Sequence, residues 1–229
     1  MTRLALIPSP FVGAVSWRPV ADLLPDAVVV DYGGVSGPDW YEGVARRIAD
    51  QVDGQPWVAV LHSGAGGFAP AIAAVARELA GFVFVDAVLP YPGRSNLETA
   101  PAALQDQLRR LATDGRLAPW NQWFGEDPLP RLIPDEALRV AFLAAQPRVP
   151  FAFLEAVSPA DAAWETLPCA YLQLSKGYEA TADKAEARGW PVRRVRLNHL
   201  GMCSDPAAVA GELLALTARS PSGSFPDAT

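Results

Sequence analysis

Short apolar segments alternate with alanine-rich, amphipathic segments along most of this chain. The clearest apolar segments are "WVAVLH" at 57–62 and "GFVFVDAV" at 81–88. Strands that are apolar throughout are typical of a parallel sheet with helices on both faces. We therefore predict an α/β fold, an open, doubly wound, mostly parallel sheet of about six strands with helices on both faces. The other predicted strands are 4–8, 27–32, 169–175 and 191–197, and the predicted helices are 39–53, 67–80, 101–114, 134–146, 179–189 and 205–218.

One interval breaks this alternation. Roughly eighty residues, rich in proline and aromatic residues, separate the strand at 81–88 from the strand at 169–175. A single crossover between neighbouring strands needs far fewer residues. We predict a small helical cap insertion at 93–164, a core formed by 1–92 and 165–219, and a flexible tail at 220–229.

Composition limits the class of partner. The formal charge is −6, half of the residues are hydrophobic, and the one dense basic cluster, "RRVR" at 193–196, suits the exposed side of a strand. Apolar runs are too short to span a membrane, and the prolines at 8 and 10 interrupt the first one too early for a signal peptide. We expect a cytoplasmic monomer or homodimer that acts on a small molecule and binds neither nucleic acid nor membrane.

The segment "VAVLHSGAGGFAPAIAAVA" at 58–76 joins a buried strand to a helix through a turn of small residues. In a parallel sheet, ligands bind at the carboxyl ends of the strands, and Ser63 follows such an end. A sharp turn there holds the serine above the sheet in strained backbone angles and directs the first N–H groups of the helix toward the same point. Small neighbours are required, and residues 64–67 supply them.

The turn "LHSGAGG" (61–67) resembles the nucleophile elbow of the α/β-hydrolase superfamily, which is usually G-x-S-x-G and often G-H-S-x-G. His62 and Ser63 match this pattern, whereas Leu61 and Ala65 stand where the two glycines belong. The chain resembles compact actinobacterial members with an HSGAG elbow. The likeness follows the order of elements over nearly the whole chain, and it is specific at the elbow and at one downstream histidine.

That histidine is His199, in "RLNHLGM" between the last predicted strand and the last predicted helix. The resemblance implies that His199 is the catalytic base and that an acid precedes it in the chain. The stretch "KGYEATAD" after the strand at 169–175 offers Glu179 and Asp183, of which Glu179 lies nearer the strand end. Asp86, at the end of the strand that follows the elbow, is the alternative acid.

The resemblance also implies an oxyanion hole, formed by the backbone N–H of Gly64 and that of Phe11 or Val12 in "IPSPFVG" (7–13). The prolines in that stretch have no N–H to donate. Trp120, Trp123 and Phe124 in the cap are candidates for an apolar substrate pocket, or else form the core of the cap itself.

The expected function is hydrolysis of an ester, thioester or amide of a small, partly apolar substrate by Ser63, His199 and an acid. No cofactor is expected, and the sequence has no Cys/His cluster typical of a metal site. Cys203, four residues after His199, is expected to pack rather than react. Two alternatives stay open: a non-hydrolytic epimerase, cyclase or lyase that uses the same pocket, and a ligand-binding protein with a vestigial triad.

Overall fold

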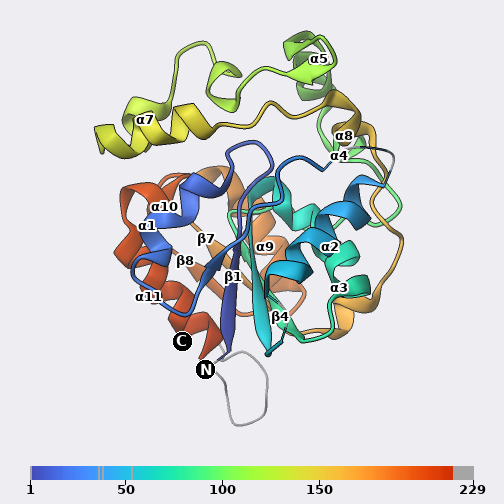
Figure 1. Cartoon of the computed structure of the whole chain (residues 1–229), viewed down its shortest axis with the longest axis vertical. Coiled ribbons are helices and arrows are strands. Elements are labelled where there is room, and N and C mark those ends of the chain that lie inside the picture. Colours follow the sequence, from blue (N-terminus) through green and yellow to red (C-terminus); the bar gives the residue numbers. More distant parts are fainter. Residues whose placement is uncertain (1, 36, 38, 53, 219–229) are drawn as a thin grey trace.

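The computed structural model describes residues 2–35, 37, 39–52 and 54–218 and contains a six-stranded parallel sheet (Figure 1). The strand order is β2-β1-β3-β4-β7-β8, and every neighbouring pair is parallel. This confirms the expected open, doubly wound sheet. The strands are β1 (Arg3–Ile7), β2 (Val28–Val29), β3 (Trp57–His62), β4 (Leu79–Val85), β7 (Cys169–Gln173) and β8 (Val192–Arg194).

Helices cover both faces of the sheet because alternate residues of each strand point to opposite sides. Ala59 and Leu61 of β3 belong to one hydrophobic cluster, whereas Val58 and Val60 belong to the other. The first cluster contains α2 (Trp40–Val52), α3 (Ala69–Val75) and α9 (Glu179–Ala187), and the second contains α1 (Arg18–Ala21), α10 (Gly201–Ser204) and α11 (Pro206–Thr217).

Most of the chain between β4 and β7 lies beyond the carboxyl ends of the strands, at the top of Figure 1. Its last part returns to the start of β7, with the 3₁₀ helix η4 (Ala163–Thr166) in contact with α3. We call residues 93–164 the cap segment. Its elements are α4 (Asn96–Thr99), α5 (Ala102–Leu111), the antiparallel pair β5 (Ala112–Thr113) and β6 (Arg116–Leu117), the 3₁₀ helix η3 (Trp120–Gln122), α6 (Leu129–Leu132), α7 (Glu136–Ala145) and α8 (Phe151–Glu155). Its Leu117, Phe153 and Leu154 are buried in the first cluster of the core.

Most predicted elements are present, and several are shorter than expected. The strand predicted over 191–197 is reduced to the three residues of β8, Val192–Arg194. The helix predicted over 67–80 ends at Val75, because 63–68 form a 3₁₀ helix and β4 already begins at Leu79. The strand predicted over 27–32 is reduced to β2, two residues at the edge of the sheet. The tail expected at 220–229 lies outside the described residues. In the part of the chain that the structure describes, no helix has the length and apolarity needed to cross a membrane.

Candidate active site

Ser63 lies where β3 ends and the 3₁₀ helix η2 (Ser63–Phe68) begins. Its φ is 55°, in the left-handed region that a residue with a side chain rarely adopts. The expected strained turn is therefore present. Ser63 is only 8% exposed, and its carbonyl accepts a hydrogen bond from Val88 N (3.0 Å), which ties the turn to the exit of β4.

The glycines of the turn allow close packing around Ser63. A Cβ on Gly66 would overlap the backbone carbonyl of Val88, and a Cβ on Gly64 would come within 3.0 Å of the Phe11 ring. Leu61, where the superfamily pattern has glycine, is fully buried and pairs with Ile7 of β1 and Phe84 of β4. The apolar core accommodates this departure without displacing the strand.

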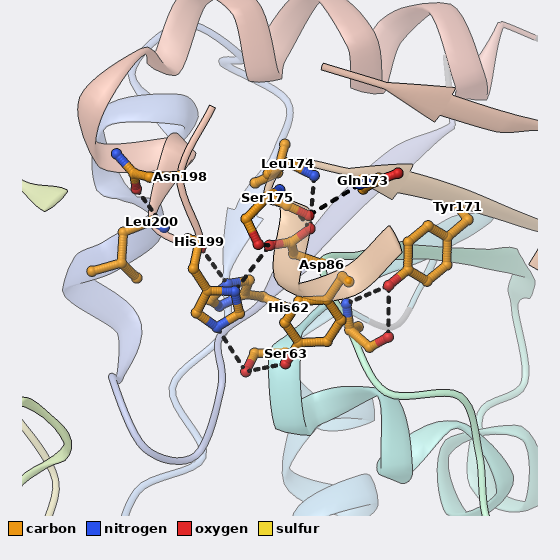
Figure 2. A network of polar contacts seen from close by, with 12 residues as sticks. His62, Ser63, Asp86, Tyr171, Gln173, Leu174, Ser175, Asn198, His199 and Leu200 are labelled. Carbon is orange, nitrogen blue, oxygen red and sulfur yellow. Dashed lines mark hydrogen bonds and ion pairs between the residues drawn. The ribbon is translucent and has the colours of Figure 1, made fainter. Parts of the chain in front are cut away.

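His199, in the loop after β8, reaches Ser63 (Figure 2). Its Nε2 lies 3.1 Å from Ser63 Oγ, and its Nδ1 lies 3.0 Å from Asp86 Oδ2. A carboxylate accepts hydrogen bonds only, so Nδ1 carries the proton and Nε2 is free to accept the hydrogen of Ser63. The structure thus joins three of the expected residues in a chain of hydrogen bonds from serine to carboxylate.

Asp86 is completely buried directly after β4, with a φ of 42°. Its two oxygens accept four hydrogen bonds: from Leu174 N (2.7 Å), Ser175 N (3.0 Å), Ser175 Oγ (2.5 Å) and His199 Nδ1. Because β4 and β7 are paired, the exit of β7 supplies three of these donors. A buried carboxylate requires such partners to remain charged.

Glu179, the acid first expected, is not brought to His199. It is exposed at the start of α9. Asp183, on the same helix, forms an ion pair with Arg194 of "RRVR", which also contacts Glu186. Two arginines of the basic cluster are thus paired with carboxylates of this chain, Arg194 as above and Arg193 with Glu212, and Asp86 occupies the position beside the imidazole.

His62 supports the His199 loop from below. Its ring lies 4.8 Å from the His199 ring between centroids, and its Nε2 donates to the backbone carbonyl of His199 (3.0 Å). Burial, and then the neighbouring imidazole, lower the pKa of His62 well below its ordinary value. His62 is therefore neutral, and its Nδ1 is buried without a hydrogen-bond partner among the described residues.

Tyr178 was not among the expected residues. It ends the 3₁₀ helix η5 (Lys176–Tyr178), its ring stacks on His199, and its hydroxyl lies 3.5 Å from Ser63 Oγ. The sequence gives only a weak signal for this role, because Tyr178 is a single tyrosine directly before Glu179 in "KGYEATAD". Ser175, which donates to Asp86, was not expected either. It lies two residues after the end of β7, and the sequence does not show that this position lies beside the end of β4.

Two of the three candidate aromatic residues line a hollow beside His199. This hollow has a volume of about 820 Å³, and its wall includes Trp120, Phe124, Tyr178 and His199. Trp123 instead packs on the Phe11 ring at 5.0 Å between centroids, with its indole N–H bonded to Ala118 O (2.8 Å). Aromatic and apolar side chains thus form one part of the wall, and the charged side chains of Glu126, Asp127, Arg131 and Lys176 form another.

Donors for an oxyanion are available at the elbow. The first N–H groups of a helix have no partner within that helix, and Gly64 is the second residue of η2. The N–H of Phe11 makes a long hydrogen bond to Ser9 Oγ (3.4 Å), and the N–H of Val12 donates to Ser9 O (3.2 Å). Gly64 is therefore the donor with the fewest competing contacts.

Both cysteines lie outside this constellation. The Cys203 thiol is buried and donates to Ser16 O (3.3 Å), and burial raises its pKa to about 12. This agrees with the expected packing role, because the thiolate is the reactive form. Among the described residues, no group of three or more His, Cys, Asp or Glu side chains is arranged to hold a metal ion.

The architecture is similar to solved structures from bacteria and plants. An extracellular α/β-hydrolase from a Paenibacillus species, described as a structural and functional homologue of tobacco salicylic acid binding protein 2, matches with a TM-score of 0.76 and 18% identity over 93% of this chain and 98% of that chain. A pyrethroid hydrolase from Sphingobium faniae matches with a TM-score of 0.67 and 16% identity (96% and 98% covered). Tomato methylketone synthase I, as a variant bound to β-ketoheptanoate, matches with 0.68 and 12% identity (95% and 98% covered).

No protein-family model matches the sequence, and no curated protein does. At identities this low, the structural likeness shows the fold, and the three matches differ in the reactions that their names describe. The reaction therefore depends on the side chains of the site and not on the fold alone.

Proposed function

We propose that this chain, which has the α/β-hydrolase fold, is a serine hydrolase that cleaves an ester, thioester or amide of a small, partly apolar substrate. The observation that carries the proposal is the hydrogen-bonded series Ser63–His199–Asp86, in which the imidazole lies between the hydroxyl and a buried carboxylate. Its distances, 3.1 and 3.0 Å, suit proton transfer from Oγ to Nε2.

In the proposed reaction, Ser63 Oγ attacks the carbonyl carbon and its proton passes to His199 Nε2. Asp86 holds the Nδ1–H tautomer and stabilises the imidazolium that forms. The N–H of Gly64 faces the developing oxyanion, and the N–H of Phe11 joins it after leaving the long contact with Ser9. The leaving group takes the proton from Nε2, and water then cleaves the acyl-enzyme by the same steps.

The substrate follows from the surroundings of the triad. The adjoining hollow is large enough for a drug-sized molecule, and Trp120 and Phe124 give it an aromatic wall. We propose that these two residues contact the substrate, whereas Trp123 packs against the Phe11 ring.

The proposal is tested with a fluorophosphonate probe and p-nitrophenyl esters. The wild-type protein should be labelled at Ser63, as located by peptide mass spectrometry. Ser63→Ala should abolish labelling and lower kcat by about 10⁴-fold or more, with an unchanged thermal unfolding temperature. An unlabelled Ser63 in the folded protein, or full activity of Ser63→Ala, would contradict the proposal and favour a non-hydrolytic enzyme or a binding protein.

The identity of the acid is tested in the same assay. Asp86→Asn should lower kcat by about 10⁴-fold, because an amide donates to Nδ1 and selects the wrong imidazole tautomer. Glu179→Gln is the matched carboxylate-to-amide control and should retain wild-type activity, since Glu179 is exposed. The reverse result would return the role to Glu179.

A further inference from the structure

Tyr178 stands over the serine and the histidine together. Its ring is parallel to the His199 imidazole, with an angle of 3° between the planes and 5.1 Å between the centroids. Its hydroxyl lies 3.5 Å from Ser63 Oγ. A substrate acyl group bound to Ser63 must therefore place its oxygens close to this phenol.

The Tyr178 hydroxyl is protonated, and its O–H group can donate a hydrogen bond to a substrate. Burial raises the pKa of Tyr178 to about 12, so that the hydroxyl is neutral at pH 7. In the described part of the chain, Ser63 Oγ is its one hydrogen-bond partner, at a distance beyond the usual 2.5–3.0 Å for two hydroxyls. A substrate oxygen bound beside these two hydroxyls would accept a shorter hydrogen bond from the phenol than the one that the resting site provides.

The position of Tyr178 indicates which substrate oxygen accepts this hydrogen bond. The oxyanion is assigned to the N–H groups at the start of η2, and His199 Nε2 delivers the proton to the leaving group. Tyr178 is stacked on that imidazole and lines the same hollow of about 820 Å³. We infer that the Tyr178 hydroxyl donates a hydrogen bond to the leaving-group oxygen while the ester C–O bond breaks, and that the leaving group occupies this hollow.

This inference rests on the proposed function and adds one donor to it. The electron pair of the breaking C–O bond moves to the leaving-group oxygen, and the proton comes from His199 Nε2. Tyr178 keeps its own proton and stabilises the charge that appears on that oxygen before the proton arrives. The contribution is greatest for a basic alkoxide and smallest for a leaving group whose charge is already delocalised.

The test compares Tyr178→Phe with the wild type on two esters of the same acyl group. One ester releases p-nitrophenol and the other an alkyl alcohol, and kcat/KM reports the acylation step for each. We expect Tyr178→Phe to lower kcat/KM about 10- to 100-fold for the alkyl ester. For the p-nitrophenyl ester the loss should stay within about 3-fold, because its leaving group needs little stabilisation.

Tyr41→Phe is the matched control, because it removes a core hydroxyl whose one hydrogen-bond partner among the described residues is the Tyr91 hydroxyl (3.0 Å). It should leave the ratio of the two kcat/KM values unchanged. The rate of fluorophosphonate labelling at Ser63 checks that each variant has a folded site. It also separates the two failures, because absent labelling of the wild type refutes the serine hydrolase itself.

Three results would overturn the inference while Ser63 is still labelled. Unchanged kcat/KM values for both esters in Tyr178→Phe leave the tyrosine a purely structural role. An equal loss on both esters assigns the hydroxyl to the oxyanion instead. A gain on both esters in Tyr178→Ala identifies the ring as a barrier over Ser63.

Discussion

Two residues of the candidate site, Ser63 and Asp86, have positive φ although neither is glycine. Such a conformation costs about 1–3 kcal/mol and persists only where the surroundings determine it fully. The backbone shows how: Ser63 O accepts from Val88 N at 3.0 Å, and Asp86 N donates to Leu172 O at 2.8 Å. This backbone conformation keeps the hydroxyl above the sheet and the carboxylate beside the imidazole, so that stability is exchanged for the geometry that the proposed reaction requires.

His62 makes the stability of the protein depend on pH. Its pKa is lowered in the folded state by burial and by His199, whereas an unfolded histidine titrates near 6.5. Below that pH the unfolded chain binds a proton that the folded protein excludes, so the free energy of unfolding falls as pH falls. Between pH 6.5 and 5 the free energy of unfolding should therefore fall steadily as the pH is lowered. His62→Gln, which keeps a donor for the His199 carbonyl, should show a smaller fall in melting temperature over this range.

Glu98→Gln provides the control for this measurement. The pKa of Glu98 is lowered by the hydrogen bond that it accepts from Ser95 N, so its contribution to stability is lost only as pH falls below about 4.5. This variant should therefore keep the wild-type pH dependence between 6.5 and 5. If His62→Gln also keeps it, some other group must cause the acid sensitivity.

At the level of elements, the sequence determines most of the sheet because the strands are buried on both faces. Strand β3 covers the predicted 57–62 without change, since all six residues are buried. The position of the elbow follows from that strand and from the small residues after it. The edge strand β2 is only two residues long, because an edge position does not require an unbroken apolar run.

The choice of acid depended on tertiary structure, which no local pattern contains. Strands β4 and β7 are neighbours, with Val85 paired to Leu172, so their exits lie side by side. A carboxylate after either strand is close enough to approach the same histidine, and the chain alone gives no reason to prefer Asp86 over Glu179. Tyr178 was missed on the same ground, because a stacking partner for His199 is defined only once the two loops are folded together.

The close approach between η2 and the segment that follows β4 can be tested by substitution. Gly66→Ala should lower the free energy of unfolding by about 1–3 kcal/mol or more, because the new Cβ overlaps the Val88 carbonyl at the exit of β4. Gly211→Ala is the matched control in α11, where a Cβ meets nothing within 4 Å. It should stabilise the protein by about 0.5–1 kcal/mol, as expected for an exposed helical glycine. Urea denaturation of both variants measures the difference, and equal stabilities would refute the close approach.

At the scale of the whole molecule, the two hydrophobic clusters share one sheet. Val60 and Leu61 are neighbours in β3 and yet belong to opposite clusters. Neither cluster can be exposed unless the strands that carry both are disrupted. The proposed triad spans the same structure, since Ser63 follows β3, Asp86 follows β4 and His199 lies between β8 and α10. We therefore expect the two faces and the site to unfold in one cooperative step.

The two cysteines can test this cooperativity, because they lie on opposite faces. Cys169 belongs to the cluster with α2, α3 and α9, and Cys203 to the cluster with α1 and α11. Burial raises the pKa of each thiol to about 12, so neither should react with an alkylating reagent at pH 8 while the protein is folded. In pulses of alkylation at increasing urea concentration, both should become labelled with the same midpoint, as read by peptide mass spectrometry. Two controls are needed. Normalising to labelling in fully denaturing urea removes the difference in intrinsic reactivity between the two thiols, and Cys169→Ala shows whether labelling of one face opens the other.

If Cys203 were labelled at a lower urea concentration than Cys169, the face formed by α1, α10 and α11 would open on its own. The loop that carries His199 would then open with it.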